Sequence, residues 1–222
     1  MLQFSLVEQI ALALFLLSGI SFFLYHLLLR LRIVLKGKSN FSVDELPKRI
    51  IRVFDEVILH KKVASGKRKS AGILHALVMY GFIFFGLITI NHFGMAFGLP
   101  IFSESFRHTY FLIFGAPWAI LCTIGILGLA YRRFVIKPEA LGKFSSTSAL
   151  VSVFIVTLMT TYLIDELHIL TGAAEKFNWW LHSGVIGGFL FLIPQSKHMH
   201  LVLSPFNIFL RPFEVPNHGA IP

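Results

Sequence analysis

The chain has 222 residues, of which 55% are hydrophobic and only 14% are charged. Its mean hydropathy of +0.74 is too high for an ordinary water-soluble domain of this length, so the composition indicates a protein that lies in lipid. The net charge of +9 suits anionic headgroups or an acidic partner, and it gives no reason to invoke nucleic acid.

Five apolar stretches are long enough to cross a hydrocarbon core, which takes roughly 20 residues of helix. No basic region precedes the first stretch, and its flanking charges, Arg30 and Arg32, follow it, so we expect a retained helix rather than a cleaved signal peptide. The pattern predicts an all-α integral membrane protein, a bundle of five transmembrane helices. In chain order the stretches are residues 10–29, 71–97, 109–131, 145–164 and 178–199.

Lysine and arginine are distributed unevenly between the two expected sides of the membrane. Residues 30–69 carry 12 of them, residues 132–143 carry 4, and the tail from Lys197 onward carries 2. The other side has only Arg107 and Lys176. Because cytoplasmic loops carry the excess of basic residues, this count predicts an N-terminus outside and a cytoplasmic C-terminus.

The segment between the first two stretches has the pattern of a helix that lies in the membrane interface. From about residue 42 to residue 62, apolar residues such as Ile50, Phe54 and Ile58 recur at helical intervals, and charged residues fill most other positions. We expect a surface helix packed against headgroups. The alternative is a docking platform for a cytoplasmic subunit.

The chain has one cysteine, Cys122, in the middle of the third stretch. It has neither a CxxC nor a CxxCH motif, so the sequence offers no iron–sulfur ligand set and no covalent haem attachment. We interpret Cys122 as a small core residue.

Histidines within membrane spans are costly and are therefore functional candidates. His182 and His200 are 18 residues apart, which is five turns of an ideal helix, or about 27 Å along one face of the fifth span. His75 and His92 stand 17 residues apart on the second span, about 25 Å in height. Because the two spans run in opposite directions, packing them together would pair His75 with His200 and His92 with His182.

Paired imidazoles from facing helices are how a helical bundle holds a b-type haem, one on each side of the iron. The inner pair, His75 and His200, is the first candidate. The outer pair has a weaker fit, because His75 and His92 are about 100° apart around an ideal helix. His168, beside two acidic residues at the end of the fourth span, is an alternative partner for His182. We expect His92, because the same pair of helices then carries both sites.

The stretch IPQSKHMHLVLSPFNIFLRP, preceded by WWLH, resembles the end of a membrane cytochrome b domain. That domain is shared by the nitrate reductase gamma subunit and the membrane subunits of heterodisulfide-reductase-like complexes. The resemblance implies that His182, and His200 in a Pro-x-Ser-Lys/Arg-x-x-His pattern, both ligate haem. KRKSAGILHALVMYGF similarly resembles the start of the family's second helix, with His75 as the inner ligand. The resemblance to this family also implies a multi-pass protein of the bacterial or archaeal cytoplasmic membrane.

The sequence departs from this family at the outer site. Where the nitrate reductase subunit has its second ligand on the second helix, this chain has Phe85, which cannot ligate. In the heterodisulfide-reductase-like branch, a segment like FLRPFEVPNHGAIP leads into a ferredoxin-like domain. We therefore expect a membrane domain over residues 1–212, a connector over residues 213–222, and an iron–sulfur partner that is a separate polypeptide or lies beyond this sequence.

The sequence favours the haem-carrying membrane subunit of a quinone-linked oxidoreductase. Electrons would pass between a cytoplasmic iron–sulfur partner and a quinone-type carrier in the membrane. Candidate groups for a protonatable quinone edge are Asp165, Glu166 and His168 outside, or Lys197 and His198 inside. Two alternatives stay open, a histidine-lined metal transporter and a membrane anchor without cofactor.

Overall fold

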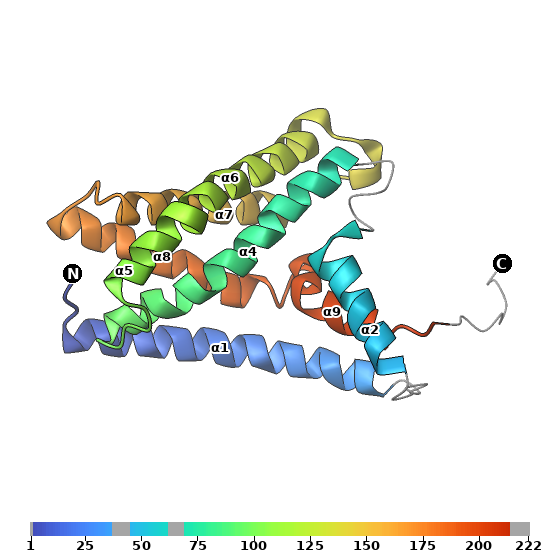
Figure 1. Cartoon of the computed structure of the whole chain (residues 1–222), viewed down its shortest axis with the longest axis horizontal. Helices are drawn as coiled ribbons and strands as arrows, with labels where there is room; N and C mark the ends of the chain where they lie inside the picture. Colours follow the sequence, from blue (N-terminus) through green and yellow to red (C-terminus); the bar gives the residue numbers. More distant parts are fainter. Residues whose placement is uncertain (1, 37–44, 62–68, 214–222) are drawn as a thin grey trace.

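The structure is a computed structural model that describes residues 2–36, 45–61 and 69–213. All regular secondary structure in these residues is helical. The α-helices, labelled in Figure 1, are α1 (Leu6–Leu35), α2 (Leu46–Val53), α4 (Lys69–Ala96), α5 (Glu104–Tyr110), α6 (Ala116–Tyr131), α7 (Ser146–Glu166), α8 (Gly172–Leu192) and α9 (His200–Leu210). Shorter π- and 3₁₀-helical segments are Phe54–Ile58, Phe111–Gly115, Arg132–Ile136, Glu139–Leu141 and Lys197–Met199.

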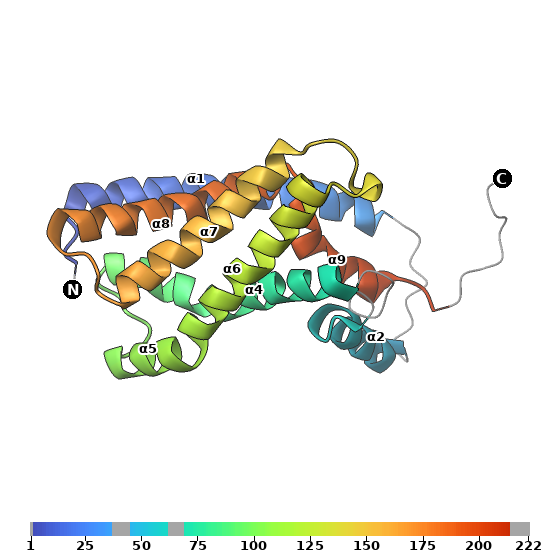
Figure 2. The ribbon, with the colours of Figure 1, turned by 90° about the horizontal axis from the view of Figure 1, so that it is seen from above.

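The long helices pack around a common interior. Helix α4 packs on α6, α6 on α7, α7 on α8, and α8 on α1 (Figures 1 and 2). The Gln9 side chain of α1 donates to the Ala96 carbonyl of α4 at 3.0 Å, which links the first and last members of this series. Helices α4 and α8 thus face each other across the interior and meet through side chains.

Glycine permits the closest of these helix contacts. A Cβ atom added at Gly125 of α6 would lie 2.8 Å from the Leu74 carbonyl oxygen of α4, too close for any larger residue without a backbone shift. Close backbone approach at small residues is the usual way in which membrane helices associate.

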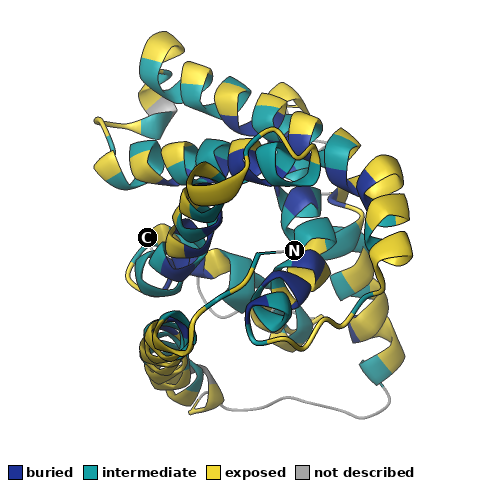
Figure 3. Ribbon diagram, turned by 90° about the vertical axis from the view of Figure 1, so that its left-hand side faces the viewer, coloured by how far each residue is buried: buried dark blue, intermediate teal, exposed yellow. Residues whose placement is uncertain are grey.

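Large apolar side chains cover the outside of the bundle. Buried positions turn inward and exposed positions turn outward (Figure 3). On α1, for example, Leu14 and Leu17 are 64% and 61% exposed. Such a surface would be unfavourable in water and is expected against lipid chains.

Four helical segments among the described residues are long and apolar enough to cross a membrane: Leu6–Ile33, Lys69–Ala96, Glu104–Ile136 and Ser146–Glu166. They cover the first four predicted spans except Phe97 and Ser145. Helix α8, the core of the fifth predicted span, is not among them, because its first half carries polar side chains such as Glu175, Lys176 and Asn178.

The prediction of one continuous fifth helix to residue 199 is wrong. Helix α8 ends at Leu192, a turn follows, and His200 begins the separate helix α9. The physical reason is Pro194, which lacks the N–H that would donate to the preceding turn of the helix. His182 and His200 therefore do not lie on one face of a single helix.

The predicted interfacial segment is helical over residues 46–58 and packs against α9, and the helix ends before Leu59 and His60. Residues 42–44 and 62 of that prediction lie outside the described residues. The buried Arg49 guanidinium donates to the Phe209 carbonyl at 2.8 Å, and Arg52 donates to the Arg211 carbonyl at 2.7 Å. These bonds tie α2 to the chain that leaves α9.

Candidate functional site

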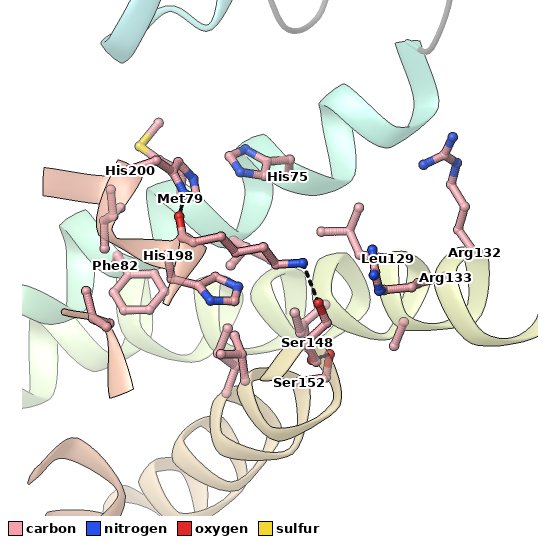
Figure 4. Close-up of a pocket in the computed structure, with 18 of the residues that line it drawn as sticks. His75, Met79, Phe82, Leu129, Arg132, Arg133, Ser148, Ser152, His198 and His200 are labelled. Carbon is pink, nitrogen blue, oxygen red and sulfur yellow. Dashed lines mark hydrogen bonds between the residues drawn. The ribbon is translucent and has the colours of Figure 1, made fainter. Parts of the chain in front are cut away.

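The two predicted inner histidines lie together. His75 projects from the first turns of α4, and His200 begins α9; their ring centroids are 6.0 Å apart, with 35° between the ring planes (Figure 4). A metal-bound imidazole nitrogen lies about 2 Å from its metal, so two imidazoles on opposite sides of one iron have centroids roughly 6 Å apart. The inner pair has this spacing.

The hydrogen bonds of the inner pair leave ring nitrogen atoms available to bind a metal. Nδ1 of His200 donates to the Lys197 carbonyl oxygen at 2.8 Å. A bond of this kind fixes the tautomer and directs the lone pair of Nε2 outward, as in metal-bound histidines generally. Nδ1 of His75 is buried and has no hydrogen-bond partner among the described residues. Ligation itself stays a prediction.

A cavity of about 360 Å³ opens beside this pair, within the size range of small-molecule sites. His75 and His200 line it, together with His198 (Figure 4). Its walls are mostly apolar side chains from four helices, for example Val78, Phe82, Ile126, Val151 and Phe189. A flat, largely apolar ligand could therefore reach the histidines.

A third imidazole, that of His60, lies beside His75 and was not foreseen from the sequence. Its ring centroid is 5.9 Å from that of His75, and its side chain is only 6% exposed. The backbone of His60 has a φ of +51°, an uncommon conformation outside glycine. The hydroxyl of Tyr80 donates to the Ile58 carbonyl at 2.5 Å and so ties the preceding turn to α4.

The turn between α8 and α9 brings two further basic groups to the inner site. Nζ of Lys197 donates to the Ser148 hydroxyl at 2.7 Å. The ring centroid of His198 lies 6.3 Å from that of His200. Burial, and next the charge of Lys197, lower the pKa of His198 to about 4, so that His198 is neutral at physiological pH.

The two predicted outer histidines also lie together, at the other end of the bundle. His92 of α4 and His182 of α8 have ring centroids 5.0 Å apart. His92 is 7% exposed, and its ring stacks on Trp179 at 4.7 Å with 15° between the planes. The angular offset expected between His75 and His92 does not prevent both from facing the interior.

The outer pair is already hydrogen bonded within the protein. Nε2 of His92 lies 2.9 Å from the hydroxyl of Ser183, which is fully buried. Nδ1 of His182 lies 2.7 Å from the Thr161 hydroxyl, which itself donates to the Thr157 carbonyl. Thr161 therefore accepts from Nδ1 of His182, and His182 also has a hydrogen bond to the backbone of Leu158.

The cavity at the outer pair is small, about 50 Å³, and it has an acidic side. Asp165 and Glu166 line it, and Arg107 of α5 lies 3.4 Å from the Glu166 carboxylate. Phe85 also lines it and packs edge-on against the Tyr162 ring at 5.0 Å.

His168, the alternative outer partner, lies elsewhere. It is exposed in the turn after α7, has a φ of +51°, and is not among the residues that line the outer cavity. The structure thus brings His92, rather than His168, to His182. Among the described residues, no three His, Cys, Asp or Glu side chains are grouped to hold a single metal ion.

The comparisons with known proteins give one curated relative. The chain is 29% identical to the probable iron–sulfur-binding oxidoreductase FadF of Bacillus subtilis (strain 168), over 86% of this chain and 31% of that protein. The chain therefore spans about a third of the length of this relative. No protein-family model matches the chain, and no solved structure matches it significantly.

Proposed function

We propose that the chain is the b-type haem membrane subunit of an oxidoreductase, passing electrons between a cytoplasmic iron–sulfur partner and a membrane quinone. The observation that carries the proposal is the inner pair: His75 and His200 stand 6.0 Å apart beside a cavity of about 360 Å³. These two residues would be the axial ligands at the inner end, and His92 and His182 the ligands at the outer end. Haem bound there would supply a one-electron redox centre.

The protein's own groups fit this role unequally at the two ends. At the inner end, Nε2 of His200 is directed away from the Lys197 carbonyl, and the cavity is already open. At the outer end, His92 would exchange its bond to Ser183 for the metal, while Thr161 would continue to orient His182. The inner site is therefore the primary one.

We further propose that α8 is a fifth crossing and that the N-terminus lies outside. Helix α8 has 21 residues, roughly 31 Å of helix, and it runs antiparallel to α4 (Figure 1), which it meets at the outer histidine pair. The basic segments 45–61, 132–143 and the turn at Lys197 lie toward the end of the bundle that carries α2 and α9 (Figure 1). This end would face the cytoplasm.

The orientation has a direct test. Single cysteines at Lys48 and at Glu104 should react with an impermeant thiol reagent from opposite sides, the first only after the cytoplasmic face is opened. The native Cys122 is buried and serves as the unreactive background. Labelling of the Lys48 position from outside would overturn the orientation.

The partner assignment rests on the relative. The name of that protein describes an iron–sulfur-binding oxidoreductase, and the bilayer is the natural place for a quinone-type carrier. Two groups of side chains would be the candidates for proton exchange with such a carrier, Asp165 and Glu166 at the outer cavity or Lys197 and His198 at the inner one. Quinone reduction assayed in Asp165→Asn and in His198→Ala separates the two ends.

The proposed function is tested by the haem content of protein purified from membranes. The alternatives of a metal transporter and an anchor without cofactor both predict protein without haem. We expect b-type haem in the wild-type protein and its loss from one site in His75→Ala. His26→Ala is the matched control, because His26 lies on α1 and packs on Phe22 and Tyr25 instead of on another histidine.

A further inference from the structure

Three lysine and arginine side chains line the inner cavity, and two of them, Arg133 and Lys197, have no acidic partner among the described residues. Arg133 and Lys197 both line this cavity, and no aspartate or glutamate is among the residues that line it. Neither side chain takes part in an ion pair among the described residues. Burial lowers the pKa of Lys197, and the nearby charge of Arg133 lowers it further. Two neighbouring positive charges at a partly dry cavity are unfavourable unless an anion joins them.

The protein's own hydrogen bonds leave part of Arg133 unsatisfied. Its Nη2 is 3.4 Å from the carbonyl oxygens of Leu141 and Lys143, the outer limit of a hydrogen bond. Its Nε is buried and has no partner among the described residues. Buried donors of this kind are rare in a finished site and mark a place where an acceptor is missing.

The two ends of the cavity differ in chemistry. One end holds the imidazoles of His75 and His200, the walls are apolar, and Arg133 and Ser148 lie toward the other end (Figure 4). The Lys197 ammonium reaches this end by its bond to the Ser148 hydroxyl. A ligand that matches all three parts has a metal for the imidazoles, a flat apolar body and carboxylates at one edge. A tetrapyrrole with two propionate groups has this chemistry.

We propose that Arg133 and Lys197 form a carboxylate clamp that binds the propionate groups of the inner haem, with Ser148 positioning the Lys197 ammonium. The proposal rests on the proposed function and adds how the tetrapyrrole is oriented. A guanidinium and an ammonium each give charge-assisted hydrogen bonds to carboxylate oxygens. Anionic lipid headgroups offer the same acceptor chemistry at this depth, so the test must separate the two sources.

The test compares wild-type protein with Arg133→Gln, Lys197→Gln and the control Arg132→Gln, all purified in detergent with their haem. Arg132 also borders the cavity, but its guanidinium is drawn farther from the labelled histidines than that of Arg133 (Figure 4). Haem transfer to an excess of apomyoglobin gives the release rate of the inner haem. We expect about tenfold faster release in each of the first two variants and less than twofold change in the control.

A second measurement tests the wild-type protein first. Apoprotein from haem-limited cells is titrated with haem b and with its dimethyl ester, which lacks free carboxylates. The wild-type protein should prefer the free acid by about tenfold or more, and Arg133→Gln should lose most of this preference. Phospholipid bound per protein, measured in the same samples, reports on the headgroup alternative.

The outcomes are distinguishable. Equal affinity of wild-type protein for haem and its ester overturns the clamp while leaving the proposed function intact. Loss of anionic phospholipid in Arg133→Gln and Lys197→Gln, with unchanged haem release, assigns the cations to headgroups and also overturns it. An equal effect of Arg132→Gln means general surface charge, again against the clamp. Wild-type protein that neither contains nor binds haem removes the proposed function itself.

Discussion

The two ends of the bundle carry the same residue pair in different states. At the inner end, His75 and His200 stand 6.0 Å apart beside a cavity of about 360 Å³. At the outer end, His92 and His182 are 5.0 Å apart beside a cavity of about 50 Å³, and each ring is bonded to a neighbouring hydroxyl. The inner end is open and incompletely bonded, and the outer end is closed and internally satisfied.

This difference indicates at which end the binding of a ligand is more favourable. A buried nitrogen without a partner, such as Nδ1 of His75, costs free energy on the order of 1–3 kcal/mol, and a ligand that bonds this atom would recover it. At the outer site a ligand must replace the His92–Ser183 bond and separate the two rings. We therefore expect the inner site to bind its haem more tightly than the outer one.

The largest effect is expected at the inner pair. His75→Ala and His200→Ala should each remove about one haem per chain, because an iron held by two imidazoles loses an axial bond. The helices should stay inserted, since the wall of apolar side chains is unchanged. Pyridine haemochrome assay of purified variants measures the loss, and full haem content in both would make the inner assignment wrong.

The next effect is expected at the outer pair. His92→Ala and His182→Ala should lower haem content while the inner haem stays in place, and His168→Ala should have no effect, because His168 is exposed away from the outer cavity. The haem-to-protein ratio of these variants shows which histidine is the partner of His182. Loss in His168→Ala alone would identify the other partner, and a wild-type ratio near one would remove the outer haem.

A smaller effect is expected from the hydroxyl that orients His182. Thr161→Val removes the acceptor 2.7 Å from Nδ1, and lost support of this kind costs about 10- to 100-fold in metal-site affinity. Haem titration of the outer site measures it. Thr123→Val is the matched control, because Thr123 makes the same intrahelical bond, to Ala119, with no histidine beside it. Equal effects of both variants would mean a general packing defect.

The smallest effect is expected from the bond that competes with ligation. Ser183→Ala frees Nε2 of His92, so the outer affinity for haem should rise, by about fivefold for one neutral hydrogen bond. Ser18→Ala on α1, whose hydroxyl donates only to the Phe15 carbonyl, serves as control. A fall in outer occupancy would show that Ser183 supports His92 in the bound state instead.

Hydropathy predicted the positions of the helices because a lipid environment favours apolar side chains along the whole length of a span. The second predicted span, residues 71–97, differs from α4 by two residues at its start and one at its end. The prediction of the fifth span was wrong because it extended the helical period through Pro194 to residue 199. Helix α8 ends at Leu192, shortly before this proline, which is visible in the sequence. His75 and His200 still lie together, because the turn between α8 and α9 brings His200 close to α4.

Other parts of the site had no signal in the sequence. Thr161 and His182 lie 21 residues apart on different helices, and only the packing of α7 on α8 brings them together. His60 stands in a left-handed conformation after a π-helical turn, a geometry that periodicity cannot predict. Side-chain partners of this kind depend on tertiary packing, whereas spans depend on composition alone.

The central claim is that the chain binds b-type haem between paired histidines. The visible absorption spectrum of the purified wild-type protein, reduced minus oxidised, tests it most directly. The account predicts the sharp reduced bands of bis-histidine haem, weakened by about one equivalent in His75→Ala and unchanged in His26→Ala. A wild-type spectrum without haem bands, from protein made in haem-sufficient cells, would contradict it.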